Sequence, residues 1–174
     1  MKQHRHFEDE LERLKECLVQ MAGLAESQVD MAVEALLERE IERAEQVIDR
    51  DPEIDDLEVS IDNQAISLLA LQQPMARDLR FITMAMKISN DLERVGDHAV
   101  NIAHALSYIV ESPPLPQLPE LEEMTGLSTE MLNDALNAFV QSGLPDSISR
   151  ATIRCLPYIG IACSFAALPT PILS

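Results

Sequence analysis

The sequence predicts an all-α protein, a three-helix bundle of long antiparallel helices. The first observation is composition: only five of the 174 residues are glycine, none is tryptophan and 3% are aromatic. Such a mixture favours helices over sheets. The second is periodicity, because three long stretches repeat apolar residues at spacings of three and four, as amphipathic helices do. The third is the short connections between these stretches, which make consecutive helices antiparallel neighbours.

The first helix is expected from Phe7 to Arg39 and carries packing rather than chemistry. Its apolar residues keep a helical period with charged residues between them: Phe7, Leu11, Leu14, Leu18, Met21, Ala25, Met31 or Ala32, Ala35 and Leu36. Gly23 lies inside this pattern, and an interior glycine indicates that another backbone comes close. The three cysteines match no zinc-binding spacing.

The second helix is expected from Ile41 to about Leu71, and Pro52 should kink it or reset its start. Six residues are predicted to face inward: Val47, Ile54, Leu57, Ile61, Ala65 and Leu68. Four acids follow at spacings of four, three and four, which makes one narrow stripe beside the apolar face: Asp51, Asp55, Glu58 and Asp62. An ordinary exposed face mixes charges of both signs, so four acids in register are notable.

The third helix is expected within Gln73–Ala105, with Pro74 in its first turn. Its apolar stripe comprises Leu79, Ile82, Ala85, Ile88, Leu92, Val95, Ala99, Ile102 and Leu106. Glu93 and Asp97 are four residues apart, so both carboxylates share one face and repel each other. A bound cation would favour this pairing, although a solvated acidic face remains the alternative. The amides Asn90 and Asn101 lie on the same side and can also ligate hard cations.

Acidic faces on two neighbouring helices would repel strongly unless cations or protons neutralise them. Oxygen ligands suit Mg²⁺, Ca²⁺ or Mn²⁺, and carboxylate clusters also hold iron. The net charge of -17 argues against nucleic acid as a partner. The N-terminal residues lack the apolar run of a secretory signal, so a cytoplasmic protein is expected.

The remaining chain is divided into a proline-rich linker (112–119), a fourth helix (120–141) and an apolar tail (142–174). The segment from Met124 aligns with that from Met21 in its apolar pattern, which indicates a second three-helix unit that stops after one helix. Residues beyond about Gln141 are interpreted as a foreign continuation, as after a frameshift or truncation. The alternative is a short apolar strap that docks on the bundle.

The chain resembles the PhoU family of phosphate-transport regulators in VIDRDPEIDDLEVSID (47–62), QPMARDLRFI (73–82) and ISNDLERVGDHAVNIA (88–103). The resemblance implies two tandem three-helix bundles, of which the second is truncated here. It implies a non-enzymatic cytoplasmic regulator that restrains phosphate uptake and phosphate-starvation signalling. Its partners would be the importer's ATPase and a sensor histidine kinase, without direct membrane insertion. The family's metal-binding motifs, for iron or zinc, fall on Glu93 with Asp97, Asp51 with Asp55, and Glu58 with Asp62.

Two other functions compete with a metal-binding regulator. A metal-free adaptor would use the same acids to bind a basic partner. A di-iron carboxylate enzyme would need Glu-x-x-His pairs, which the sequence lacks. No phosphate-binding glycine loop or nucleophile-base pair appears either. The exposed apolar face of an unpaired fourth helix predicts a homodimer or aggregation.

Overall fold

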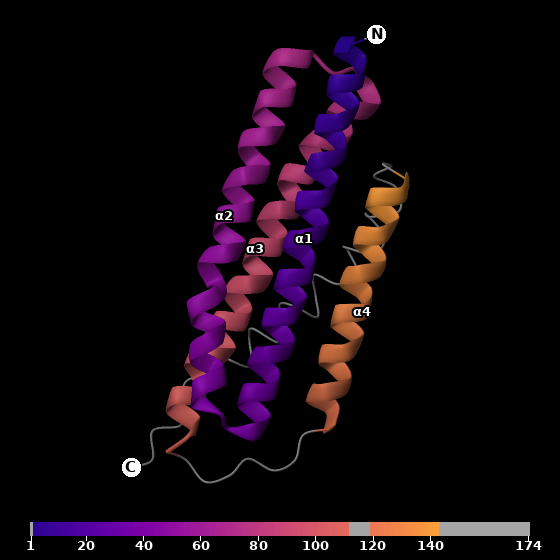
Figure 1. The fold of residues 1–174 in the computed structure, drawn as a ribbon. Coiled ribbons are helices and arrows are strands. Elements are labelled where there is room, and N and C mark those ends of the chain that lie inside the picture. Colours follow the sequence, from indigo (N-terminus) through magenta and orange to yellow (C-terminus); the bar gives the residue numbers. More distant parts are fainter. Residues whose placement is uncertain (1, 112–118, 143–174) are drawn as a thin grey trace, which may run out of the picture.

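The computed structural model describes residues 2–111 and 119–142, which form four helices and no strand (Figure 1). They are α1 (Lys2–Glu38), α2 (Ile41–Gln72), α3 (Ala76–Ile109) and α4 (Pro119–Ser142). α1, α2 and α3 form an antiparallel bundle, and α4 lies beside α1. The predicted all-α class is therefore confirmed. The tail and nearly all of the expected linker lie outside the described residues.

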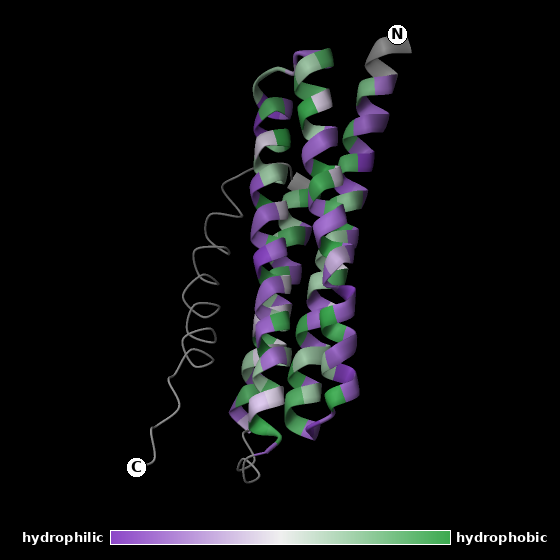
Figure 2. Cartoon of the chain, turned by 90° about the vertical axis from the view of Figure 1, so that its left-hand side faces the viewer, coloured by the Kyte–Doolittle hydropathy of each residue, from purple (hydrophilic) through white to green (hydrophobic). Residues whose placement is uncertain are grey.

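Each bundle helix is amphipathic and turns its apolar residues toward the other two (Figure 2). Five of the six inward positions predicted for α2 are buried, and the sixth, Leu57, is half-buried. In α3 the periodic stripe is confirmed from Ile82 to Leu106, where its members are buried or half-buried. Removing these apolar side chains from water is the main force that holds the three helices together.

α2 runs from Ile41 through Pro52 without a break, so this proline does not reset the helix start, which was one of its two predicted effects. Three other local predictions were wrong. Pro74 precedes α3, whose N-cap is Met75 and whose first residue is Ala76. Leu79 is 42% exposed rather than part of the core. No atom lies within 4 Å of a Cβ built on Gly23, so no neighbouring backbone explains that glycine.

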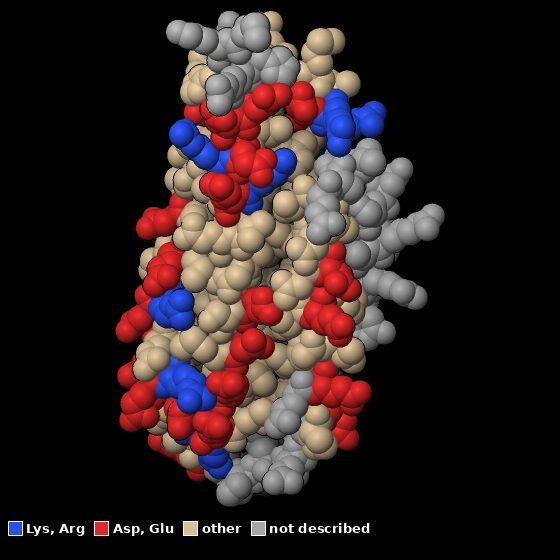
Figure 3. Space-filling view, turned by 45° about the vertical axis from the view of Figure 1, so that its right-hand side comes forward, with Lys and Arg blue, Asp and Glu red and all other residues tan. Residues whose placement is uncertain are grey.

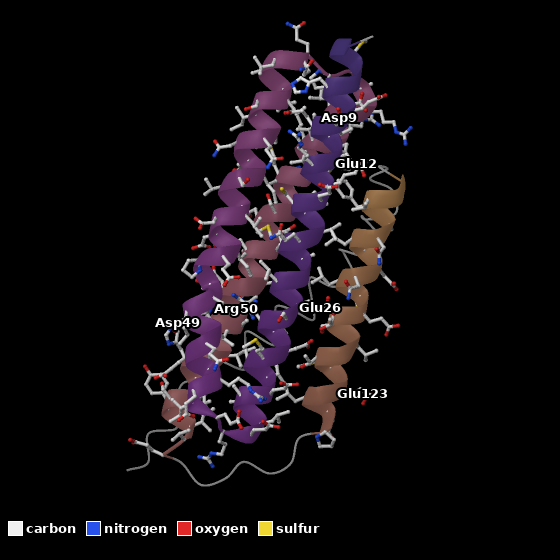
Figure 4. The ribbon with its side chains drawn as sticks, in the orientation of Figure 1. Asp9, Glu12, Glu26, Asp49, Arg50 and Glu123 are labelled. Atoms are coloured by element: carbon white, nitrogen blue, oxygen red, sulfur yellow. The ribbon has the colours of Figure 1, made fainter. Side chains whose placement is uncertain are left out.

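α4 docks on the bundle through apolar side chains that join the core cluster, an aromatic stack and a hydrogen bond. The rings of Phe139 and Phe81 lie 4.7 Å apart at an interplanar angle of 5°, and both side chains are buried. Glu26 extends from α1 toward α4 (Figure 4) and accepts a hydrogen bond of 2.9 Å from the Asn133 amide. The other apolar side chains of α4 are more exposed than Phe139, and Leu127 is 53% exposed. None of the described helices is long and apolar enough to cross a membrane.

Arg39, in the turn between α1 and α2, fastens that turn to the end of α3. Its guanidinium Nη2 donates to the carbonyl oxygens of Ile109 and Val110, at 2.6 Å and 2.8 Å. The last carbonyls of a helix lack partners within the helix and carry its negative dipole end, so a cation there is favourable. One side chain therefore joins all three bundle helices at this end.

We expect Arg39→Gln to lower the free energy of unfolding by about 1–3 kcal/mol, because it removes two charge-assisted hydrogen bonds. Gln keeps a side chain at a residue whose φ is 59°, so the change does not relieve backbone strain as glycine would. Urea unfolding followed by circular dichroism measures the effect. Arg13→Gln, which loses only an exposed pair with Glu10, is the control and should change little. Equal losses in the two variants would contradict the assignment.

Candidate metal centre

Five of the six predicted ligands come together where α2 and α3 pack against each other, and we call this group the acidic seam: Asp51, Asp55 and Glu58 of α2, with Glu93 and Asp97 of α3. The pKa of Glu93 is raised, first by burial and then by the charges of Asp97, Glu58, Asp55 and Asp51. Because the repelling charges sit on both helices, the carboxylates share one electrostatic environment.

Asp51 belongs to the same group from the opposite helix. Its pKa is raised first by burial, then by Asp55 one turn along α2 and by Asp97 across the seam. Asp62, the sixth predicted ligand, contributes to neither raised pKa. Asn101 is exposed. The seam is thus centred on Asp51, Asp55, Glu93 and Asp97, with Glu58 toward the end where α2 finishes.

No basic side chain in the described part of the chain neutralises the seam. None of its five carboxylates forms an ion pair with a described Lys, Arg or His. The arginines nearest in sequence pair with other acids, Arg50 with Glu53 at 3.7 Å and Arg94 with Asp91 at 3.8 Å (Arg50 is labelled in Figure 4). Among the described residues, one hydrogen bond is donated to a carboxylate of the seam: the Asn90 amide donates to Glu58 Oε1 at 3.3 Å. The repulsion is therefore left largely uncompensated.

Gly96 explains how α3 comes close enough to bring these acids together. A Cβ at Gly96 would lie 3.0 Å from Ile54 Cδ1 and 3.4 Å from Gln28 Oε1. Ile54 is fully buried and directly precedes Asp55, as Gly96 directly precedes Asp97. A tight contact between the two helices therefore lies beside the acids. A residue with a side chain here would push them apart.

Gln28 of α1 reaches the same level of the bundle from the third helix. Its side chain is 1% exposed, and its Oε1 atom has no hydrogen-bond partner. Orphaned buried oxygens are costly and therefore rare. Sequence reasoning missed both Gln28 and Gly96, because polar and small residues on an inward face do not register in a hydrophobic pattern. A break in the apolar stripe of α1 at Gln28 was the only signal.

The seam fits a cation by chemistry but not by present geometry. Carboxylate oxygens are the donors that hard cations and iron prefer, and a cation would relieve the repulsion. As the side chains stand, however, no three His, Cys, Asp or Glu groups in the described part of the chain are arranged to hold a metal ion. His98 is half-buried, and its pKa is lowered by burial, then by Arg94, which favours the neutral imidazole that can ligate a metal. Ligation requires the carboxylates to rotate toward one another.

Comparison with known proteins points to one family. The family model of the PhoU domain matches residues 18–106. A phosphate-specific transport system accessory protein PhoU homolog of Aquifex aeolicus is 44% identical over 76% of this chain and 60% of its own length. One from Clostridium acetobutylicum is 40% identical over 79% of this chain and 64% of its own length. The chain therefore spans less than two thirds of these relatives.

Solved structures agree with the sequence matches. The crystal structure of PhoU from Pseudomonas aeruginosa aligns with a TM-score of 0.74 at 29% identity, covering 92% of this chain and 95% of that one. The phosphate transport system regulatory protein PhoU from Streptococcus pneumoniae aligns with a TM-score of 0.71 at 25% identity. The chain is therefore similar to these two proteins in the arrangement of its helices as well as in its sequence.

The close approach at Gly96 is tested by comparing alanine at the two interior glycines. Gly23→Ala should stabilise by about 0.5–1 kcal/mol, because alanine is the better helix former and nothing is near. Gly96→Ala should be less stable than Gly23→Ala by about 1–3 kcal/mol, because its Cβ overpacks against Ile54. Chemical unfolding gives both values. In an Ile54→Val background, which removes the crowding Cδ1 atom, the cost of Gly96→Ala should shrink; an unchanged cost would contradict this contact.

Repulsion in the seam predicts a pH-dependent stability. Glu93 holds its proton to a higher pH when folded than at its ordinary pKa of 4.5. Its contribution is therefore most favourable below that value and is lost as the pH rises through the folded pKa. Metal-free Glu93→Gln should exceed the wild type in thermal stability at pH 7, and the difference should diminish toward pH 4. Asp51→Asn should behave alike; a gap that does not change with pH in either variant would exclude the repulsion.

Proposed function

This chain belongs to the PhoU family, and we propose that it acts as an accessory regulator of phosphate uptake and of phosphate-starvation signalling. The observation that carries the proposal is the family match over residues 18–106, which includes all of α2 and the whole seam. Two relatives named as accessory proteins of the phosphate-specific transport system are 40% and 44% identical to the chain, which supports a role in phosphate transport. We interpret the chain as the first three-helix repeat followed by one helix of a second, so the proposal concerns the function of one repeat.

The proposed action is binding rather than catalysis, and it takes place in the cytoplasm. The curated relatives are named as accessory proteins, which supports a non-enzymatic role. The partners we propose are the ATPase of the phosphate importer and the associated sensor histidine kinase, both restrained by the bound regulator. A homodimer is proposed as well, because α4 leaves Leu127 more than half exposed and self-association would cover it.

We further propose that the acidic seam holds iron or zinc. Uncompensated carboxylates from two helices support a cation, and an all-oxygen donor set favours iron over zinc, which prefers nitrogen and sulfur. The proposed ligand pairs are Asp51 with Asp55 and Glu93 with Asp97. Charge repulsion among these carboxylates contributes to the raised pKa values of Asp51 and Glu93. A bound cation would supply charge neutralisation, while Gly96 and Ile54 keep the two helices close enough for both pairs to reach it.

The metal-free adaptor keeps one specific observation in its favour. No three metal-ligating side chains are arranged to hold an ion in the part of the chain that the structure describes. In that case the seam would present its negative charge directly to a basic partner surface. A di-iron carboxylate enzyme has no such support, because neither His98 nor His104 follows a glutamate by three residues.

Elemental analysis of the purified protein tests the metal proposal. The wild type should contain stoichiometric iron or zinc, and Glu93→Ala/Asp97→Ala should lose most of it, because the variant lacks one of the two proposed ligand pairs. Added metal should also raise the melting temperature of the wild type and not that of the variant.

The control is Glu53→Ala/Asp56→Ala, which removes the same number of charges from exposed positions on α2 outside the seam. This control should keep its metal. Equal metal content in all three proteins would sink the site assignment. Absence of metal from the wild type, even after reconstitution, would leave the adaptor function.

A further inference from the structure

The end of the bundle where α2 turns into α3 differs in character from the rest of the molecule. Residues 63–76 contain no Asp, Glu, Lys or Arg, in a chain of which 25% is charged. Three large apolar side chains are exposed around this turn, Leu71 by 74%, Met75 by 81% and Leu79 by 42%. Single exposed apolar residues are ordinary on a protein surface, but three around one turn mark a contact site.

Two arginines flank these apolar side chains, and we call the five residues together the apolar tip: Leu71, Met75, Arg77, Leu79 and Arg80. Both arginines are exposed. Arg80 forms no ion pair with any described residue. The N-terminus of α1 lies at the same end (Figure 1). Asp78, between the two arginines, is half-buried. The turn therefore exposes apolar side chains and two positive charges, although the net charge of the chain is -17.

The geometry points to the apolar tip as a docking site for a protein partner that offers an apolar hollow rimmed by acidic side chains. Exposed Met and Arg are among the residues enriched at protein interfaces. The apolar side chains would enter the hollow and lose contact with water, while the arginines pair with the acidic rim. This inference rests on the proposed function, since it assigns the surface through which the importer's ATPase would be bound.

A protein fits the tip better than an anionic membrane does. Acidic side chains spread over much of the face shown in Figure 3, and Lys and Arg are few there. Asp9 and Glu12 lie in the first turns of α1, near the tip (Figure 4). An extended anionic bilayer would face these acids as well as the arginines, whereas a protein hollow places its acids only opposite the arginines.

Binding of the full chain to the purified importer ATPase, measured by biolayer interferometry, tests the inference. Leu71→Ser/Met75→Ser should weaken binding by at least about tenfold, because two desolvated anchors are lost. The matched control is Leu37→Ser/Ile41→Ser, at the opposite end of the bundle, where both residues are also exposed; it should bind like the wild type. The exposed positions of all four residues make misfolding a minor concern, and thermal melting checks it.

The arginines are tested in the same assay. Arg80→Gln should weaken binding several-fold and reduce its dependence on salt, because charge pairs at an interface mainly raise the association rate. Arg94→Gln, which removes one exposed positive charge from α3 fourteen residues further from the turn, should change neither.

Each remaining outcome has a distinct meaning. Wild-type binding that is unaffected by the tip variants overturns the docking site and leaves the proposed function standing. No binding by the wild type counts against the ATPase as partner, and so against the proposed function itself. Flotation with phosphatidylglycerol–phosphatidylethanolamine vesicles that Leu71→Ser/Met75→Ser abolishes would replace the protein partner with a lipid surface.

Discussion

α3 packs tightly against α1 and α2 at Gly96, and the candidate site depends on that contact. With hydrogen in place of a side chain, the backbone of α3 reaches Ile54 and Gln28 in the buried centre. Asp97 follows Gly96 and Asp55 follows Ile54, so the same contact sets acids of the two helices against each other. Tight apolar packing, not attraction between polar groups, holds the acidic seam together.

Apolar burial and charge repulsion therefore act in opposite directions on the stability of the bundle. Apolar burial along the three helices contributes stability over their whole length, while the seam subtracts from it in one region. Near the turn between α1 and α2 the acids are neutralised locally: Arg43 lies within 3.0–3.2 Å of Glu34, Glu38 and Glu40. The absence of an equivalent base among the described residues at the seam is what makes a cation, a proton or a basic partner the natural complement.

Apolar periodicity was enough to predict the helices and most of their inward faces, because burial of one stripe per helix dominates the folding energy. Of the six acids predicted as ligands from their spacing beside that stripe, five gather at the seam. Burial of single residues near the helix ends was harder to predict from the pattern. Leu79 keeps the period yet lies exposed in the first turn of α3. Gly96 and Gln28 act through contacts between helices, which no pattern within one helix contains.

The seam and the apolar tip lie on the same helical hairpin, and this connects the two proposals. α2 and α3 carry all five acids, and the turn that joins them carries the exposed Leu71 and Met75. Charge repulsion in the seam favours separation of the two helices, and a cation there would favour their association. Any change in how firmly the two helices pair changes the rigidity of the turn between them. A rigid tip loses less conformational entropy when it docks, so a cation in the seam would strengthen binding at the tip without touching the partner.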